Sequence, residues 1–279
     1  YILPNYICNF SCSYCFSAKG RSYKSLKKEH LKAALDFFID SKRITSDRLA
    51  ISYLGGGEPT LSWDVVEYGL EYGDMLARRH GITLMTTIVT NGSRITDRMV
   101  EAFNKYNVRS RVSFEILETI QNRQRGMYKN VVEGIDKLSQ GKNPPMVRSM
   151  ITPDNVGLMP EMIEELHRRF PRVSVALFDP ITSNATFNDV ETTRDFYDRY
   201  YDCFLQARKI ADKYGIKLMC APLRNLEMVV ERYCTGEFCL TPEGTITICH
   251  QISSPNEANY NDCVYAHVDS SNRLVVDNN

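Results

Sequence analysis

The sequence of 279 residues lacks an excess of charge of either sign, and it lacks long uninterrupted apolar runs. Thirty-four basic side chains balance 34 acidic ones. Proteins that bind nucleic acid usually carry a basic excess, so we expect no nucleic-acid partner. Polar residues and Pro4 interrupt the uncharged stretch 1–18 before it reaches the length of a membrane span or a signal peptide. We therefore expect no membrane partner and a cytoplasmic location.

A fully paired set of disulfide bonds is also excluded, because nine cysteines are an odd number. Disulfide-dense domains are usually much shorter than this chain, which makes metal or redox chemistry the interpretation to test. The hydrophobic share of 43% is typical of a globular protein rather than a disordered one. The chain starts at Tyr1 instead of methionine, and we expect residues to be missing from one or both ends.

Strand-like and helix-like segments alternate through the first 219 residues. Apolar residues at Leu31, Leu35 and Phe38, for example, share one face of a helix. Six strand–helix pairs imply a parallel sheet, because each helix returns the chain to the same edge. The pattern predicts an α/β fold, a partial (βα)6 TIM-like barrel, with a flat doubly wound sheet as the alternative. The expected strands are 1–7, 49–54, 83–89, 111–116, 146–151 and 173–178.

The alternation stops near residue 219, and the remainder is rich in turns. We expect a barrel domain over 1–219 and a small cysteine-containing module over 220–279. Apolar residues alternate on both sides of Gly244, at 239–241 and 245–248, which predicts a β-hairpin.

Three cysteines follow the first expected strand at the spacing C-x3-C-x2-C: Cys8, Cys12 and Cys15. Three thiolates on one loop can hold three corners of an iron–sulfur cube, and the fourth iron then stays open to a small molecule. The alternatives are a zinc site, a redox C-x-x-C pair and buried structural cysteines. A structural zinc normally takes four protein ligands. A redox pair leaves Cys8 unexplained.

With the aromatic Tyr14 just before the third cysteine, this motif resembles that of the radical S-adenosylmethionine (SAM) enzymes. The resemblance implies a [4Fe-4S] cluster whose open iron binds the amino and carboxylate groups of SAM. It also implies a flavodoxin- or ferredoxin-like electron donor. The reduced cluster of such enzymes cleaves SAM to methionine and a 5′-deoxyadenosyl radical, which abstracts a hydrogen atom from the substrate.

A glycine-rich turn follows the second expected strand and reads G-G-G-E-P-T. Glycines at a strand end let a ligand approach the backbone, and Glu58 can accept a hydrogen bond from an ammonium group. A plain tight turn is the alternative. The turn resembles the G-G-E-P element of the family, which implies that Gly56, Gly57 and Glu58 hold the amino group of SAM. Asn91, in a T-N-G turn after the next strand, resembles a further family element.

Two polar residues of the fourth expected strand, Ser113 and Glu115, alternate with apolar ones and therefore face the same side. In the family the matching positions contact the ribose and methionine ends of SAM, although aspartate is usual where this chain has Glu115. Arg125 precedes the next helix, and a guanidinium can grip the SAM carboxylate with two hydrogen bonds. A solvated charged loop is the alternative for Arg125.

A second group of cysteines lies in the C-terminal module. The spacing C-x9-G-x4-C, from Cys234 through Gly244 to Cys249, resembles the opening of the SPASM and twitch extensions. The resemblance implies an auxiliary iron–sulfur cluster, most simply [4Fe-4S], with Cys234 and Cys249 as ligands. Cys239 and Cys263 compete for the remaining places, and a zinc site of these four cysteines is the alternative. The further cysteines of a full SPASM region do not follow Cys263, which indicates a twitch module or a shortened chain.

The motifs together predict a radical SAM enzyme that acts on a peptide or protein side chain. Peptide maturases, which form thioether or carbon–carbon crosslinks in ribosomal peptides, are preferred. Anaerobic sulfatase-maturating enzymes, which form formylglycine, are the alternative, but the aspartate that they use as proton acceptor is not located here. A non-catalytic zinc-binding module is the competing class. No side chain is assigned as the general base.

Overall fold

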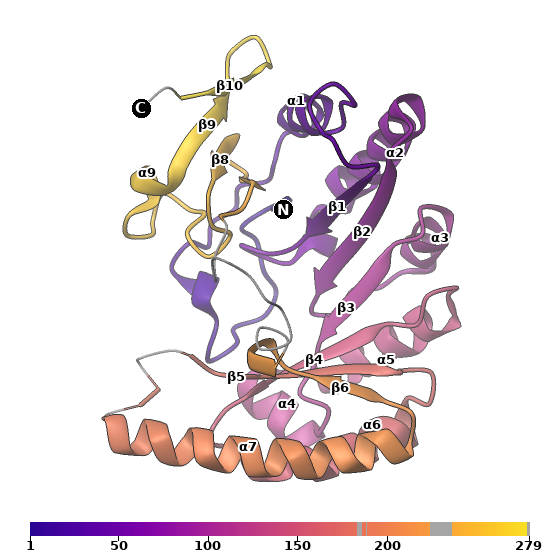
Figure 1. Ribbon diagram of the computed structural model, residues 1–279, viewed down its shortest axis with the longest axis vertical. Coiled ribbons are helices and arrows are strands. Elements are labelled where there is room, and N and C mark those ends of the chain that lie inside the picture. Colours follow the sequence, from indigo (N-terminus) through magenta and orange to yellow (C-terminus); the bar gives the residue numbers. More distant parts are fainter. Residues whose placement is uncertain (183–185, 188, 224–235, 278–279) are drawn as a thin grey trace.

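The computed structural model describes residues 1–182, 186–187, 189–223 and 236–277. Its main sheet consists of six parallel strands in sequential order. These strands are β1 (Arg48–Tyr53), β2 (Thr83–Thr90), β3 (Arg109–Ser113), β4 (Met146–Ile151), β5 (Val175–Pro180) and β6 (Lys217–Met219). The strand direction turns steadily from β1 to β6, so the sheet curves (Figure 1).

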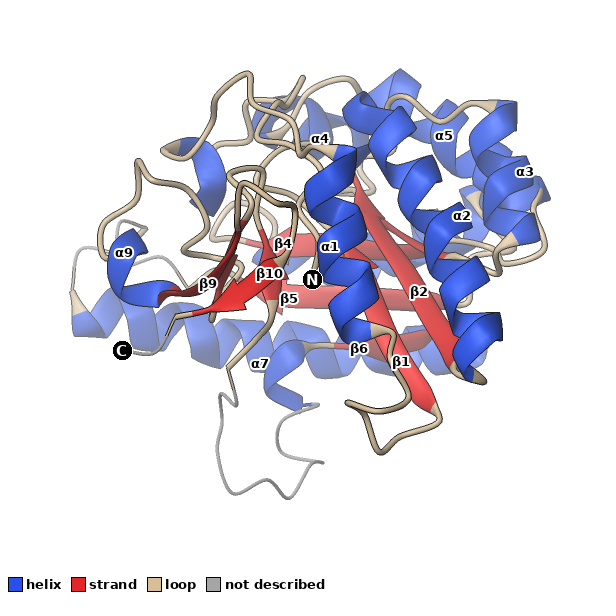
Figure 2. Cartoon of the chain, turned by 90° about the horizontal axis from the view of Figure 1, so that it is seen from above, coloured by secondary structure: helices blue, strands red, loops and turns tan. Residues whose placement is uncertain are grey.

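The main helices alternate with the strands along the chain and lie along the outer side of this curved sheet (Figures 1 and 2). They are α1 (Lys28–Phe38), α2 (Trp63–His80), α3 (Asp97–Lys105), α4 (Glu118–Gln124), α5 (Tyr128–Gln140), α6 (Met159–Arg169) and α7 (Val190–Lys213). Single turns of 3-10 helix occur at η1 (Phe16–Ala18), η2 (Pro59–Ser62) and η3 (Val156–Leu158). A flat doubly wound sheet carries helices on both faces. The arrangement therefore confirms the partial (βα)6 TIM-like barrel.

The helices form where the sequence pattern predicts them. In α3, for example, Met99, Ala102 and Phe103 are three and four residues apart and are buried on one face. Thr96 caps this helix, since its side chain accepts a hydrogen bond from the backbone N–H of Met99 at 3.3 Å. No helix in the described ranges is both long and apolar enough to span a membrane.

The expected first strand over 1–7 was wrong, and β6 takes the sixth place in the sheet. Within 1–7, Ile2 alone bridges to the sheet, with Tyr53 on one side and Leu240 on the other. Pro4 has no N–H to continue such a ladder. The chain then leaves the strand direction, because the backbone N–H of Tyr6 donates to the carbonyl of Lys24 at 3.0 Å.

The expected strand over 111–116 is displaced, since β3 ends at Ser113. Ile116 has φ of 66°, which is rare for a β-branched residue. The N–H of Leu117 donates back to the carbonyl of Glu115 at 2.7 Å. This tight turn takes Glu115 out of the strand and directs the chain into α4.

A second sheet of four antiparallel strands forms the C-terminal module. Its strands are β7 (Cys239–Leu240), β8 (Thr245–Thr247), β9 (Val264–Val268) and β10 (Leu274–Val276), and a short helix α9 (Tyr260–Cys263) precedes β9. The pairing of β7 with β8 confirms the expected hairpin. Gly244 forms the turn of this hairpin with φ of 85°.

The first residues of the chain lie between the two sheets. The N–H of Ile2 donates to the carbonyl of Ser52, and the N–H of Leu3 donates to the carbonyl of Leu240, both at 2.9 Å. The division at residue 219 stays a prediction.

Candidate functional site

Cys8, Cys12 and Cys15 lie on one loop between the N-terminal segment and η1. All three are free thiols and partly exposed. Burial raises the pKa of Cys8 and of Cys12, and the neighbouring thiols of the loop raise it further. Three free thiols thus share the loop over residues 8–15.

The donor set of this loop fits an iron–sulfur cluster in its chemistry. Among the residues that the structure describes, no three His, Cys, Asp or Glu side chains are grouped so that they could hold a metal ion. A cubane cluster is larger than a single ion, and each of its irons takes one thiolate. Three free thiols on one loop match three of these four positions.

Asparagine and serine groups attach the cysteine loop to the carboxyl ends of the strands. The side-chain N–H of Asn91, just after β2, donates to Asn9 at 2.9 Å, and Asn9 in turn donates to Ser93 at 2.9 Å. On the other side of the loop, the N–H of Ser13 donates to the carbonyl of Gln124 at 3.0 Å. Asn91 therefore lies where the T-N-G turn predicts it, but its partner is the cysteine loop itself.

The carboxylate of Glu58 is 2% exposed and occupied by hydrogen bonds within the chain. One of its oxygens accepts from the N–H and the hydroxyl of Thr60, at 3.1 and 2.7 Å, and from the hydroxyl of Thr90 at 2.6 Å. The other oxygen accepts from the N–H of Asn91 at 2.6 Å. Glu58 thus ties the turn after β1 to the turn after β2.

Gly56 and Gly57 allow a close backbone approach, and the segment that approaches is the start of the chain itself. A Cβ on Gly57 would lie 2.0 Å from the carbonyl oxygen of Ile7, and one on Gly56 would lie 2.5 Å from the ring of Tyr6. The N–H of Glu58 donates to the same Ile7 carbonyl at 2.6 Å. These glycines therefore hold the segment that leads into Cys8.

Glu115 lies in a buried network that the cysteine loop completes. Its side chain is 0% exposed and accepts hydrogen bonds from the hydroxyls of Tyr14 and Ser149 and from the N–H of Met150. Arg125 donates to the Tyr14 hydroxyl at 2.8 Å and lies 3.9 Å from Glu115. Burial raises the pKa of the Glu115 carboxyl, while the Arg125 charge and the hydrogen bonds act against this. The Tyr14 hydroxyl thus fixes the loop to a buried ion pair.

Two guanidinium groups beside the loop carry a buried N–H that has no partner among the residues that the structure describes. These are the Nε atoms of Arg125 and of Arg21. An unpaired buried donor costs free energy, so each marks a place where an acceptor would be stabilised. Ser113, the remaining predicted residue, is partly buried at the end of β3, opposite Arg148 of β4.

Two contributors to the site were missed from the sequence. The hydroxyl of Tyr14 could have been found from its place between two motif cysteines. Arg21 lies six residues beyond the motif and matches no pattern, so only the folded chain reveals its contact with Cys15.

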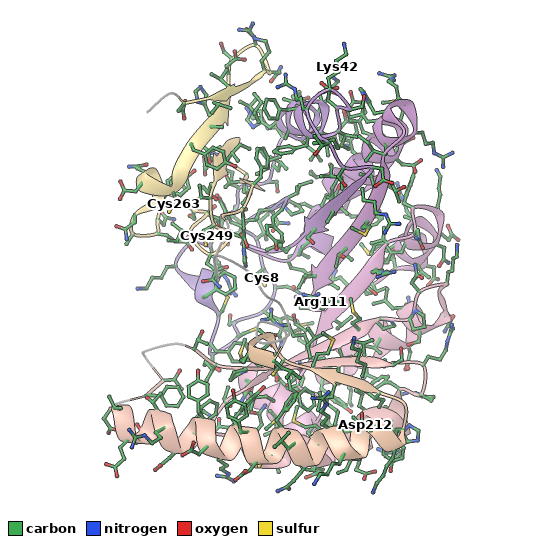
Figure 3. All side chains as sticks on the ribbon, in the orientation of Figure 1. Cys8, Lys42, Arg111, Asp212, Cys249 and Cys263 are labelled. Carbon is green, nitrogen blue, oxygen red and sulfur yellow. The ribbon has the colours of Figure 1, made fainter. Side chains whose placement is uncertain are left out.

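The structure describes three cysteines of the second group, namely Cys239, Cys249 and Cys263. Cys234 lies outside the described residues. Cys249 and Cys263 come from the C-terminal module and are labelled in Figure 3, as is Cys8. The backbone joins them, since the N–H of Ile248 donates to the carbonyl of Cys263 at 2.9 Å. Cys239 is 0% exposed and packs against apolar neighbours, and burial raises the pKa of its thiol to about 12.

Aromatic contacts connect the C-terminal module to the cysteine loop. The ring of His250, next to Cys249, lies 6.2 Å from the ring of Phe16, next to Cys15. The side chain of Glu237 orients this histidine through an Nδ1 contact of 2.5 Å. The hydroxyl of Tyr6 also donates to the carbonyl of Ser253. These contacts hold the part of the C-terminal module around Cys249 against the segment that contains Cys8, Cys12 and Cys15.

Comparisons with known proteins agree with the motifs. The family model of the Radical SAM superfamily matches residues 2–170. The radical SAM cyclopropyl synthase TigE of Paramaledivibacter caminithermalis is 27% identical over 163 residues, which are 53% of this chain and 34% of that protein. The chain thus spans about a third of the length of that curated relative.

Two solved structures share the fold. One is anSMEcpe with bound AdoMet and the Kp18Cys peptide, with a TM-score of 0.76 at 15% identity over 95% of this chain and 76% of that one. The other is Streptococcus suis SuiB bound to the precursor peptide SuiA, with a TM-score of 0.67 at 17% identity over 92% of this chain and 60% of that one.

Proposed function

The chain belongs to the radical SAM superfamily, and from this premise we propose that it modifies a peptide or protein side chain with a [4Fe-4S] cluster and SAM. When bound, these two groups supply one-electron chemistry: reductive cleavage of SAM and removal of a hydrogen atom from the substrate. A flavodoxin- or ferredoxin-like protein is the proposed electron donor. The residues of this chain bind and orient the two groups.

One observation carries the proposal, namely three free thiols on a loop that is fixed to the carboxyl ends of the strands. Cys8, Cys12 and Cys15 are the proposed ligands of the SAM-binding cluster. The carboxyl end of the strands is where barrel enzymes place their chemistry. Asn91 and Tyr14 hold the loop at that end, through Asn9 and through the Glu115–Arg125 pair.

The residues expected to contact SAM divide into two groups by their partners. Glu58 and Glu115 have their carboxylates occupied within the chain, so we assign them a positioning role. Arg125 retains a buried Nε–H for which the described part of the chain offers no acceptor, and this suits the carboxylate of SAM. Ser113 and the backbone of Gly56 are the further proposed contacts.

The C-terminal module is proposed to hold an auxiliary iron–sulfur cluster. Cys234, Cys249 and Cys263 form the proposed ligand set. Cys239 is the weaker candidate, because its side chain is completely buried among Leu3 and other apolar residues. A thiolate in such surroundings is costly to form.

A peptide maturase that forms a crosslink is the preferred activity. The solved structures with the same fold carry peptides in their descriptions, Kp18Cys with anSMEcpe and SuiA with SuiB. The relative TigE is described as a cyclopropyl synthase. The named peptides support a peptide substrate, and the name of TigE supports the formation of a carbon–carbon bond. A thioether is the other proposed crosslink. Either bond removes two hydrogen atoms from the peptide.

Anaerobic reconstitution with iron and sulfide tests the proposal. We expect broad charge-transfer absorption and, with SAM and dithionite, release of 5′-deoxyadenosine. Cys12→Ala should abolish this release while the iron of the auxiliary cluster is retained. Cys203→Ala is the matched control, because Cys203 packs against the core from α7 and should leave SAM cleavage intact. Stoichiometric zinc without SAM cleavage would refute the proposal.

The substrate is tested with a short precursor peptide encoded beside the gene. Incubation with SAM and a reductant should lower the mass of the peptide by two hydrogen atoms. Tandem mass spectrometry then locates the crosslink. An unchanged peptide, together with active SAM cleavage, would contradict the peptide substrate but not the radical SAM chemistry.

A further inference from the structure

Arg21 reaches back to the cysteine loop from the segment that follows η1. Its Nη2 donates to the sulfur of Cys15 at 3.3 Å, and its Nη1 donates to the backbone carbonyl of Phe10. Both acceptors belong to the loop, so one guanidinium connects its middle to its last cysteine. The planar fork of arginine is suited to such a pair of acceptors.

The positive charge of Arg21 is not balanced by a carboxylate. Within the described ranges, no Asp or Glu oxygen lies within ion-pair distance of Arg21. Its Nε–H is buried, and no described residue accepts a hydrogen bond from it. Partial burial of a cation without a counter-ion costs free energy, unless negative charge is nearby. The thiol of Cys15 is the group that becomes negative when it binds a metal.

Arg125, the other guanidinium at the loop, provides the contrast. It lies 3.9 Å from the buried carboxylate of Glu115 and donates to Tyr14. Arg125 therefore has a carboxylate partner within the chain. Arg21, by contrast, contacts the loop through the sulfur of Cys15 and the carbonyl of Phe10. Arg21 is thus the guanidinium that contacts a motif sulfur directly.

We infer that Arg21 is a positioning residue that fixes the Cys15 ligand and, by donating to its sulfur, raises the reduction potential of the SAM-binding cluster. This inference rests on the proposed function. Hydrogen bonds to cluster sulfurs and nearby positive charge both favour the reduced cluster, which carries one more negative charge. The one electron comes from dithionite or from the flavodoxin-like donor. Arg21 touches neither SAM nor substrate in this role.

The test compares Arg21→Gln and Arg21→Lys with the wild type in the reconstituted holoprotein. An EPR-monitored redox titration follows the signal that changes when SAM is added, and Cys12→Ala identifies this signal by removing it. We expect the midpoint potential to fall slightly in Arg21→Lys, which keeps the charge, and further in Arg21→Gln. Arg78→Gln is the control, since Arg78 pairs with Asp74 on the exposed side of α2 and should leave the potential unchanged.

A wild-type midpoint potential in Arg21→Gln with full iron content would overturn the inference. If Arg21→Gln does not bind the cluster, a wild-type potential in Arg21→Lys would overturn it instead. Loss of only the SAM-responsive cluster from both variants, with an unchanged circular dichroism spectrum, would support the positioning role. Failure of the wild type to assemble any SAM-responsive cluster would refute the proposed function, which is a separate outcome.

Discussion

Glu58→Gln should destabilise the fold, although the substitution barely changes the shape of the side chain. One carboxylate oxygen of Glu58 accepts three hydrogen bonds from Thr60 and Thr90, and the other accepts from the N–H of Asn91. A glutamine keeps only one acceptor oxygen. With that oxygen facing the threonines, the new NH2 group faces the N–H of Asn91 across a contact that measures 2.6 Å in the wild type.

The expected loss follows from these contacts. A hydrogen bond to a charged group contributes roughly 1.5–3 kcal/mol, and a buried donor left unsatisfied costs roughly 1–3 kcal/mol. At 2% exposure, water cannot replace the lost acceptor for Asn91. We therefore expect the free energy of unfolding to fall by about 3 kcal/mol.

Urea denaturation of the wild type and the variant, reconstituted under the same anaerobic conditions, measures this loss. Circular dichroism follows the whole chain, and the fluorescence of Trp63, the single tryptophan, follows the region beside Glu58. Glu67→Gln is the matched control, because Glu67 forms an exposed pair with Arg98. Equal stability of Glu58→Gln and Glu67→Gln, with weaker SAM binding in Glu58→Gln alone, would refute the anchoring role and favour direct contact with SAM.

Four further substitutions test other parts of the molecule. Gly57→Ala should lower the unfolding free energy by about 2–3 kcal/mol, because its Cβ would meet backbone at 2.0 Å. Gly73→Ala, with room for a Cβ inside α2, should raise it by about 0.5–1 kcal/mol, and urea denaturation should show these opposite signs. Tyr14→Phe removes two hydrogen bonds at the buried Glu115–Arg125 pair, so the free energy of unfolding should fall by about 2–3 kcal/mol. The variant should also lose iron to a chelator faster than the wild type, and an unchanged rate of iron loss would contradict this role of Tyr14. Cys249→Ser should remove the iron of the auxiliary cluster and leave 5′-deoxyadenosine release intact, and an unchanged iron content would count against Cys249 as a ligand.

The parallel barrel was predictable because its signals are local. Apolar spacing marks each helix, Thr96 marks the start of α3, and Gly244 marks the hairpin turn. The strands β1, β2, β4 and β5 lie within about two residues of the expected ranges. The prediction for segment 1–7 was wrong because its apolar composition suits a strand. Pro4 lacks the N–H that a strand ladder needs, and Tyr6 forms a backbone hydrogen bond with Lys24 outside the sheet.

The sequence does not predict the hydrogen-bond partners of the site residues. Motif resemblance selected Glu58, Glu115 and Arg125, but the hydrogen bonds that join them to other loops link positions 32 to 111 residues apart in the chain. No local pattern encodes such pairs, because they depend on which loops the barrel brings to one edge.

By itself the sequence determined the class of fold and the chemistry of the donors, since helix faces, capping groups and cysteine spacing act within a few residues. The tertiary structure decided how that chemistry is held. It buried Glu58 and Glu115 and surrounded them with hydrogen-bond donors from other loops, and it closed the cysteine loop with Tyr14 and Arg21. The physical reason is that a buried charge requires partners, and only the folded barrel supplies them.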